Sequence, residues 1–198
     1  MFAELLAHEG VEELCELRSR FGFMAFHGGN LEKGTDGVAL AAASMADASV
    51  YAVVQPPDLR WHIPSTEIRP ADSPALTKFL EHVDVVIAVH GFGAEEYWTT
   101  LLLGGRNRTL ATHVGSSLRA TLAPHGYDVI DELDSIPARL RGVHRDNPVN
   151  LPRGGGVQLE LPPRVRGTSP LSKPEYTSAL IDGLATAATT WSVTAPGD

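Results

Sequence analysis

The chain has 198 residues, 43% of them hydrophobic, so it can bury a sizeable core and is not a disordered protein. Its 24 acidic and 16 basic side chains give a formal charge of −8, which argues against a protein held on nucleic acid or anionic lipid by bulk charge. The single cysteine, Cys15, excludes an internal disulfide and a cysteine-based zinc knuckle. Eight histidines are the unusual feature of the composition, so any metal site must use histidine and carboxylate side chains.

Neither a membrane span nor a secretion signal is evident in the sequence. No segment approaches the roughly 18 uninterrupted apolar residues that cross a bilayer. The N-terminal segment contains Glu4 and Glu9 where a signal peptide carries basic residues, and it lacks a long apolar stretch. We therefore expect a cytoplasmic protein that binds neither membrane nor nucleic acid, with a single α/β domain over residues 1–198 and a loose end at residues 194–198.

Helical and strand patterns alternate along the chain. Apolar residues of the first segment recur at helical spacing, with a break at Gly10, and Pro74 suits the first turn of a later helix. The expected helices are 4–20, 35–47, 73–82, 109–122 and 173–191, and the expected strands are 21–26, 50–54, 83–89, 127–130 and 157–161. This alternation predicts an α/β fold with a mainly parallel mixed sheet flanked by helices.

Residues 136–156 form a long stretch rich in proline, arginine and glycine, with little periodicity. A loop of this length inside a compact domain is more often functional than idle. A net charge of −8 repels a long polyanionic substrate unless a basic cleft attracts it locally, and this stretch can supply such a cleft. The arginines that can form such a cleft are Arg139, Arg141, Arg145, Arg153, Arg164 and Arg166.

A histidine stands at the end of two predicted strands. His27 is followed by two glycines, which allow a tight turn that brings Glu32 back towards it, and His90 is followed by Gly91. Because parallel strands end at one edge of a sheet, we expect His27 and His90 to share that edge, where ligands usually bind. Imidazole and carboxylate are good partial ligands for zinc. The alternative is an ordinary pair of strand-to-helix turns with structural or solvated histidines.

Glu160 lies on the last predicted strand, where Val157, Leu159 and Leu161 face one way and Gln158 and Glu160 the other. If this side chain projects into the same cleft, it is the free carboxylate that a zinc hydrolase needs as a general base. The alternative is a solvated glutamate on a strand face.

Four motifs follow one another along the chain: His27-Gly28-Gly29 with Glu32 and Gly34-Thr35, then Trp61-His62-Ile63-Pro64-Ser65-Thr66, then His90-Gly91-Phe92, and finally Gly155-Gly156-Val157-Gln158-Leu159-Glu160-Leu161. In this order they resemble the poly-γ-glutamate hydrolase family, which includes phage enzymes that cut γ-glutamyl polymers and bacterial proteins sometimes labelled phage-related replication proteins. The sequence departs from the family pattern beside Glu32 and directly after Glu160, which bears on the substrate more than on the metal.

The resemblance implies a zinc-carboxypeptidase-like (phosphorylase/hydrolase-like) α/β fold with one zinc ion. Carried over by matching motif, the metal ligands are His27, Glu32 and His90, and Glu160 is the catalytic carboxylate. These are the positions that the strand ends and the alternation also single out.

Supporting residues are expected near the reacting carbonyl, where a hydrolase needs a cation or hydrogen-bond donor for the developing oxyanion. Arg108 is a candidate for this catalytic role, and Arg106 and Arg153 are candidates for binding an acidic substrate. His62 lies within a matching motif and is a further candidate for substrate binding. For each of these residues the alternative is a structural or solvated side chain.

The sequence therefore predicts a zinc-dependent amidohydrolase that cleaves γ-glutamyl or similar acidic amide bonds with metal-activated water. Its substrate would be a small molecule or a γ-glutamyl peptide. A related amidase for small N-acyl-amino acids or peptides is the nearest alternative, and a non-catalytic metal-binding α/β protein is another. A nucleic-acid protein, suggested by the replication label, has no support in charge or motif.

Overall fold

The computed structural model describes residues 1–192, so the loose end predicted for residues 194–198 lies outside the described residues. Within these residues the strands are β1 Glu12–Glu16, β2 Phe21–Gly29, β3 Ser49–Gln55, β4 Val85–Gly91, β5 Thr100–Leu103, β6 Asp128–Ile130 and β7 Gly156–Leu161. The α-helices are α1 Phe2–Leu6, α2 Thr35–Met45, α3 Pro74–His82, α4 Arg108–Leu122 and α5 Pro174–Thr190.

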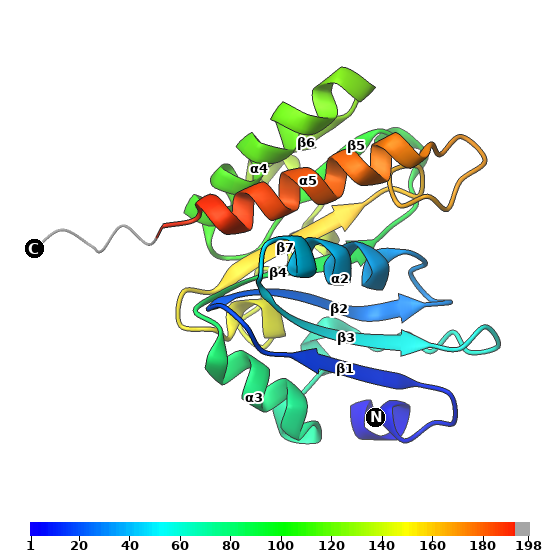
Figure 1. Ribbon diagram of the computed structural model, residues 1–198. Helices are drawn as coiled ribbons and strands as arrows, with labels where there is room; N and C mark the ends of the chain where they lie inside the picture. Colours follow the sequence, from blue (N-terminus) through cyan, green and yellow to red (C-terminus); the bar gives the residue numbers. More distant parts are fainter. Residues whose placement is uncertain (193–198) are drawn as a thin grey trace, which may run out of the picture.

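The strands of the described residues form a seven-stranded sheet in the order β1-β3-β2-β4-β7-β5-β6. β1 runs antiparallel to β3, and β5 runs antiparallel to β7, whereas the other neighbouring pairs are parallel (Figure 1). The mainly parallel mixed sheet flanked by helices, expected from the sequence, is therefore confirmed. The central parallel strands β3, β2, β4 and β7 consequently end at one edge of the sheet.

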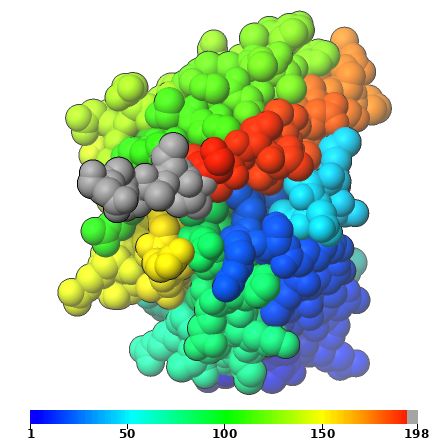
Figure 2. Space-filling model, turned by 60° about the vertical axis from the view of Figure 1, so that its left-hand side comes forward, coloured from blue at the N-terminus to red at the C-terminus, as the bar shows by residue number. Residues whose placement is uncertain are grey.

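Helices cover both faces of the sheet (Figure 1). On one face, α2, α4 and α5 bury side chains such as Val38, Val114 and Leu184 against the strands. On the other face, α1 and α3 form a second core that includes Phe2 and Phe79. The space-filling view shows α4 and α5 together at the top and α3 at the bottom (Figure 2). The sheet is thus the middle of three layers.

Strand β7 shows how the two faces differ. Val157, Leu159 and Leu161 point into the core under α4 and α5, and all three are fully buried. Gln158 and Glu160 alternate with them and therefore point to the opposite face. Within the described residues, the second core contains no side chain of β7. The polar side of this strand is left for the loop that precedes it.

Two parts of the secondary-structure prediction need correction. The helix expected over residues 4–20 ends at Leu6, and Gly10, with a φ of 79°, turns the chain before β1. The segment from Glu12 to Glu16 is an edge strand instead, because pairing with β3 satisfies its backbone groups and overrides a helical pattern that also fits. The four-residue strand β5 was not predicted, since a run this short has no distinctive periodicity.

The other predicted elements are present with ends shifted by a few residues. None of the helices within residues 1–192 has the combined length and hydropathy of a membrane-spanning segment.

Candidate active site

His27 stands at the carboxyl end of β2, where it is 2% exposed. The following turn requires glycine at position 29, because Gly29 has a φ of 68°. A Cβ atom at this position would also lie only 2.1 Å from the carbonyl oxygen of Gln55. The turn is closed by the Glu32 amide, which donates to the His27 carbonyl at 2.8 Å. The Glu32 carboxylate is thereby brought back to the histidine, as the sequence predicts.

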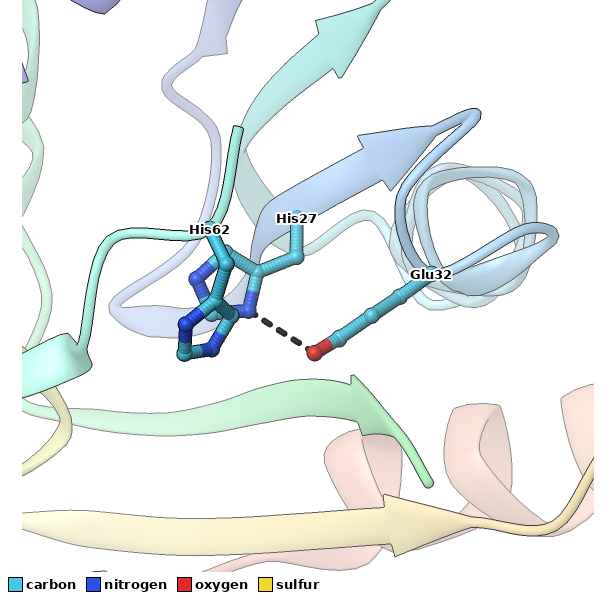
Figure 3. Close-up of side chains that lie close together, drawn as sticks. All are labelled: His27, Glu32 and His62. Atoms are coloured by element: carbon cyan, nitrogen blue, oxygen red, sulfur yellow. Dashed lines mark hydrogen bonds and ion pairs between the residues drawn. The ribbon is translucent and has the colours of Figure 1, made fainter. Parts of the chain in front are cut away.

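The His27 ring is fixed by a contact at each nitrogen. Nε2 lies 2.9 Å from the carbonyl oxygen of Ile63 and donates its proton there. In the neutral ring this leaves a lone pair on Nδ1, which lies 2.9 Å from Oε1 of Glu32 (Figure 3). A lone pair and a carboxylate oxygen repel each other at this distance unless a proton or a cation lies between them. This is the arrangement of a metal-binding histidine that donates its second N–H to a backbone carbonyl.

The second oxygen of Glu32 contacts strand β4. Oε2 accepts a hydrogen bond from the Gly91 amide at 2.8 Å and lies 3.6 Å from Nδ1 of His90. Burial acts to raise the pKa of Glu32, but its side-chain contacts with His27 and His90 outweigh burial and lower the pKa well below its usual range. Glu32 is therefore an ionised carboxylate held between two imidazoles.

His90 is 5% exposed, and its Nε2 is buried without a hydrogen-bond partner among the described residues. Burial acts to lower the pKa of His90, but its contact with Glu32 and the charge of Glu160 raise it overall. An unpaired buried polar nitrogen costs free energy, so it marks a position where a ligand is expected.

His62 approaches the same point from the loop after β3. Its neighbour Trp61 is held by Gln55, whose side chain accepts from the Trp61 amide at 2.7 Å and donates to the Trp61 carbonyl at 2.8 Å. The His62 and His27 rings lie 4.8 Å apart between centroids, and both turn towards Glu32 (Figure 3). Burial and the neighbouring His27 lower the pKa of His62, which favours its neutral form.

These side chains fit a metal ion. His27, Glu32 and His62 each offer a ligand atom, and these atoms lie within 4.8 Å of one another. His90 lies near the second oxygen of Glu32, and its ring centroid is 5.2 Å from that of His27. Imidazole nitrogen and carboxylate oxygen are the donors that zinc accepts when cysteine is absent. The carboxylate between imidazoles and the unpaired His90 nitrogen are the observations that support this fit.

Glu160 is placed next to the histidine–carboxylate group by strand pairing. It is the register partner of His90 in the parallel β4–β7 pair, and it is 4% exposed. Burial raises the pKa of its carboxyl group overall, while the neighbouring His90 and the hydrogen bond that Gln158 donates to Oε1 at 2.9 Å act in the opposite direction. A raised pKa near a cluster of polar groups suits a group that exchanges protons.

All these side chains line a cavity of about 960 Å³ at the carboxyl edge of the sheet. Its far wall is the loop over residues 138–147, which belongs to the arginine- and proline-rich stretch of the sequence. Arg106, Arg139 and Arg145 line this cavity, and the carboxylates that line it are Glu32 and Glu160. The cavity thus has a basic rim although the net charge of the chain is −8.

Arg108 and Arg153, which the sequence also suggests as site residues, do not line this cavity. The Arg108 guanidinium donates to the carbonyl oxygens of Gly105 and Leu103, each at 3.0 Å, and to that of Asp131. Arg153 lies 3.6 Å from Asp84 and lines a separate hollow beside α3. The structure therefore does not bring Arg108 or Arg153 to the cavity, because backbone carbonyls and an aspartate hold them away from it.

Several residues of the site were not singled out from the sequence. Asn147 and Gln158 form a buried chain of hydrogen bonds that ends at Glu160. The alternating pattern of β7 indicates that Gln158 faces the same way as Glu160, but no sequence pattern indicates the role of Asn147. Arg166 was expected from the sequence only as part of a basic cleft; instead it donates to the carbonyls of Lys33 at 2.6 Å and Leu161 at 3.1 Å, and so joins the Glu32 turn to the end of β7. Contacts between segments so distant in the chain leave no local pattern.

The structure is thus an α/β domain with a histidine–carboxylate cavity at the carboxyl edge of its sheet. The family model of poly-gamma-glutamate hydrolase matches residues 2–170, so the chain belongs to the poly-gamma-glutamate hydrolase family and is a hydrolase. The resemblance inferred from the four motifs is confirmed. Comparison with curated protein sequences gives no match.

Solved structures show the same fold. Bacteriophage poly-gamma-glutamate hydrolase superposes with a TM-score of 0.70 at 20% identity, over 89% of this chain and 87% of that one. The zinc-free apo form of YNDL superposes with a TM-score of 0.72 at 20% identity, over 91% and 90%. A metallo-carboxypeptidase from Burkholderia cenocepacia gives 0.50 at 9% identity, over 93% and 65%. At these identities the likeness establishes the fold.

Proposed function

We propose that this hydrolase binds one zinc ion through His27, Glu32 and His90 and cleaves γ-glutamyl or similar acidic amide bonds. The observation that carries the proposal is the position of Glu160. It is the register partner of His90 and lines the cavity that His27 and Glu32 also line. Three metal-type ligands and a separate buried carboxylate in one cavity are the parts that a metal-dependent amide hydrolase requires.

Burial favours His90 over His62 as the third ligand. The Nε2 atom of His90 is buried from water and has no hydrogen-bond partner among the described residues. Leaving this nitrogen unpaired costs free energy, and coordination of a metal ion would remove that cost. His62 is exposed and can be hydrated. We therefore assign His62 to the substrate-facing wall, where its neutral ring can hydrogen-bond a polar group of the substrate.

When bound, zinc supplies a Lewis acid that polarises a carbonyl and lowers the pKa of water. Glu160 accepts a proton from the attacking water while the water oxygen bonds to the amide carbon. As the carbon–nitrogen bond breaks, Glu160 returns that proton to the leaving amine. Its burial suits both steps, because a raised pKa brings the carboxyl group closer to the pH at which it must gain and lose a proton.

The basic rim supports an acidic substrate. Arg106 and Arg139 line the cavity, and neither forms an ion pair with a carboxylate within residues 1–192. A guanidinium fork binds a carboxylate with two parallel hydrogen bonds, which suits the free α-carboxylate of a γ-linked glutamate. We assign this role to Arg106.

The test is the turnover of a γ-linked glutamate oligomer by the zinc-loaded protein and its Glu160→Gln variant. This variant keeps the shape of the side chain and removes the base, so kcat should fall by roughly 10²- to 10⁴-fold. Glu12→Gln, an exposed position on edge strand β1, is the matched control and should retain kcat. Equal turnover by Glu160→Gln and wild type would exclude Glu160 as the base. Cleavage of N-acyl-amino acids without cleavage of the oligomer would favour the small-amide alternative.

A further inference from the structure

A chain of two buried amides leads from the cavity wall to Glu160. The Asn147 side chain donates through Nδ2 to Oε1 of Gln158 at 2.8 Å, and Gln158 donates through Nε2 to Oε1 of Glu160 at 2.9 Å. The three residues are 4%, 6% and 4% exposed, respectively. Buried hydrogen bonds of this kind are stronger than exposed ones and fix the side chains that they join.

The first amide fixes the orientation of the second. Because Asn147 presents a donor, Gln158 must turn its oxygen towards Asn147 and its nitrogen towards Glu160. The same nitrogen lies 3.3 Å from the carbonyl oxygen of Leu140. Gly142 closes over the other side, and a Cβ at this position would lie 2.4 Å from Oε1 of Gln158. The Gln158 amide therefore has one orientation available.

Gln158 contacts one of the two Glu160 oxygens. Oε2 of Glu160 makes no hydrogen bond to any of residues 1–192, so it is the oxygen left for the water and the leaving amine. Resting on the role of Glu160 in the proposed function, we propose that Gln158 is a positioning residue that holds Oε1 and aims Oε2 into the cavity, and that Asn147 keeps Gln158 in its donating orientation.

The same contacts connect Glu160, through Gln158, to the loop over residues 138–147 that forms the opposite wall of the cavity. Leu140, Gly142 and Asn147 belong to the loop over residues 138–147, and all three line the cavity. Each touches Gln158, so the loop cannot shift without disturbing the amide that holds Glu160. Correct closure of the loop thus sets the position of the carboxylate.

The experiment compares Gln158→Met and Asn147→Asp with wild type on a γ-linked glutamate oligomer. Gln158→Met keeps the side-chain length and removes the donor, so kcat should fall by roughly 10- to 100-fold with KM and zinc content retained. Asn147→Asp removes the donor to Gln158 but keeps the acceptor for the Val149 amide, and kcat should fall by about threefold to tenfold.

Asn107→Asp is the matched control, since Asn107 also caps a helix through its oxygen and donates through its amide, to the Gly154 carbonyl at 2.8 Å. It does not line the cavity, and kcat should be unchanged. Thermal unfolding of each variant, followed by circular dichroism, separates loss of the fold from loss of positioning.

A double-mutant cycle decides the mechanism. If Gln158 acts through Glu160, then Gln158→Met should lower kcat in the wild-type background and leave it nearly unchanged in the Glu160→Gln background. An equal loss in both backgrounds, or wild-type kcat in folded Gln158→Met and Asn147→Asp, would overturn the positioning role. If Glu160→Gln itself kept full turnover, the proposed function would fail first, which is a distinguishable result.

Discussion

The two faces of strand β7 are built from alternate residues of one six-residue segment, yet they do different things. On the face under α4 and α5, Leu159 is fully buried among apolar side chains. On the opposite face, Glu160 is almost as buried but is surrounded by polar side chains. Burial alone therefore does not separate a core from a site. What separates them is whether the surrounding groups are apolar or polar.

The difference follows from how the helices cover the sheet. α1 and α3 pack over β2, β3 and β4, and within residues 1–192 their core contains no side chain from β7. The polar face of β7 is covered by a loop that carries arginines and amides. This arrangement predicts that stability depends mainly on the helix-covered face, whereas metal binding and turnover depend on the loop-covered face.

The largest effect on stability is expected for Leu159→Ala. This change leaves a cavity in the core, so the free energy of unfolding should fall by about 2–5 kcal/mol. Chemical denaturation of the zinc-free protein measures it, because bound metal would add its own stabilisation. The folded fraction should retain its zinc stoichiometry and kcat. Loss of turnover with unchanged stability would contradict the division between the two faces.

A smaller effect, on substrate binding, is expected for Arg106→Ala. Removing one charge-assisted contact should raise KM for a γ-linked glutamate oligomer by roughly 10- to 100-fold, corresponding to about 1.5–3 kcal/mol. Arg153→Ala is the control, because Arg153 faces a different hollow and should leave KM unchanged. The assignment of the basic rim fails if the two variants have the same KM.

The smallest effect is expected for Tyr127→Phe, on the helix-covered face. The Tyr127 hydroxyl is buried without a partner among the described residues, so its removal should leave the free energy of unfolding unchanged or raise it by up to about 1 kcal/mol.

This change should also alter the pH dependence. Burial raises the pKa of Tyr127 to about 12, above its ordinary value of about 10. The neutral phenol thus favours the folded state below pH 10, and this contribution is lost as the pH rises towards 12. Urea unfolding at pH 8 and pH 11 should show a smaller alkaline loss for Tyr127→Phe. An equal loss in both proteins would show that Tyr127 does not titrate in this way.

The sequence predicted the sheet and the shared edge well, because buried parallel strands have a clear apolar pattern and end in histidine and glycine. It placed His27 and His90 at one edge with Glu32 turned back towards them, left the direction of Glu160 open, and the structure brings all four into one cavity. It failed at β1, where edge-strand pairing overrides a helical pattern.

The remaining features depend on contacts between distant segments. Arg108 and Arg106 are two residues apart, yet one binds backbone carbonyls and the other lines the cavity. Asn147 reaches Gln158 only after the loop has folded back over β7. No local pattern distinguishes such side chains, since their direction is set by tertiary packing.

The most direct test of the central claim is the zinc content of purified wild type beside Glu32→Ala, His90→Ala and Glu160→Gln, measured by inductively coupled plasma mass spectrometry. We predict about one zinc per chain in wild type and in Glu160→Gln, and little or no zinc in Glu32→Ala and His90→Ala, because each of these two variants lacks one of the three proposed ligands. Full zinc retention by both Glu32→Ala and His90→Ala would contradict the proposed metal site.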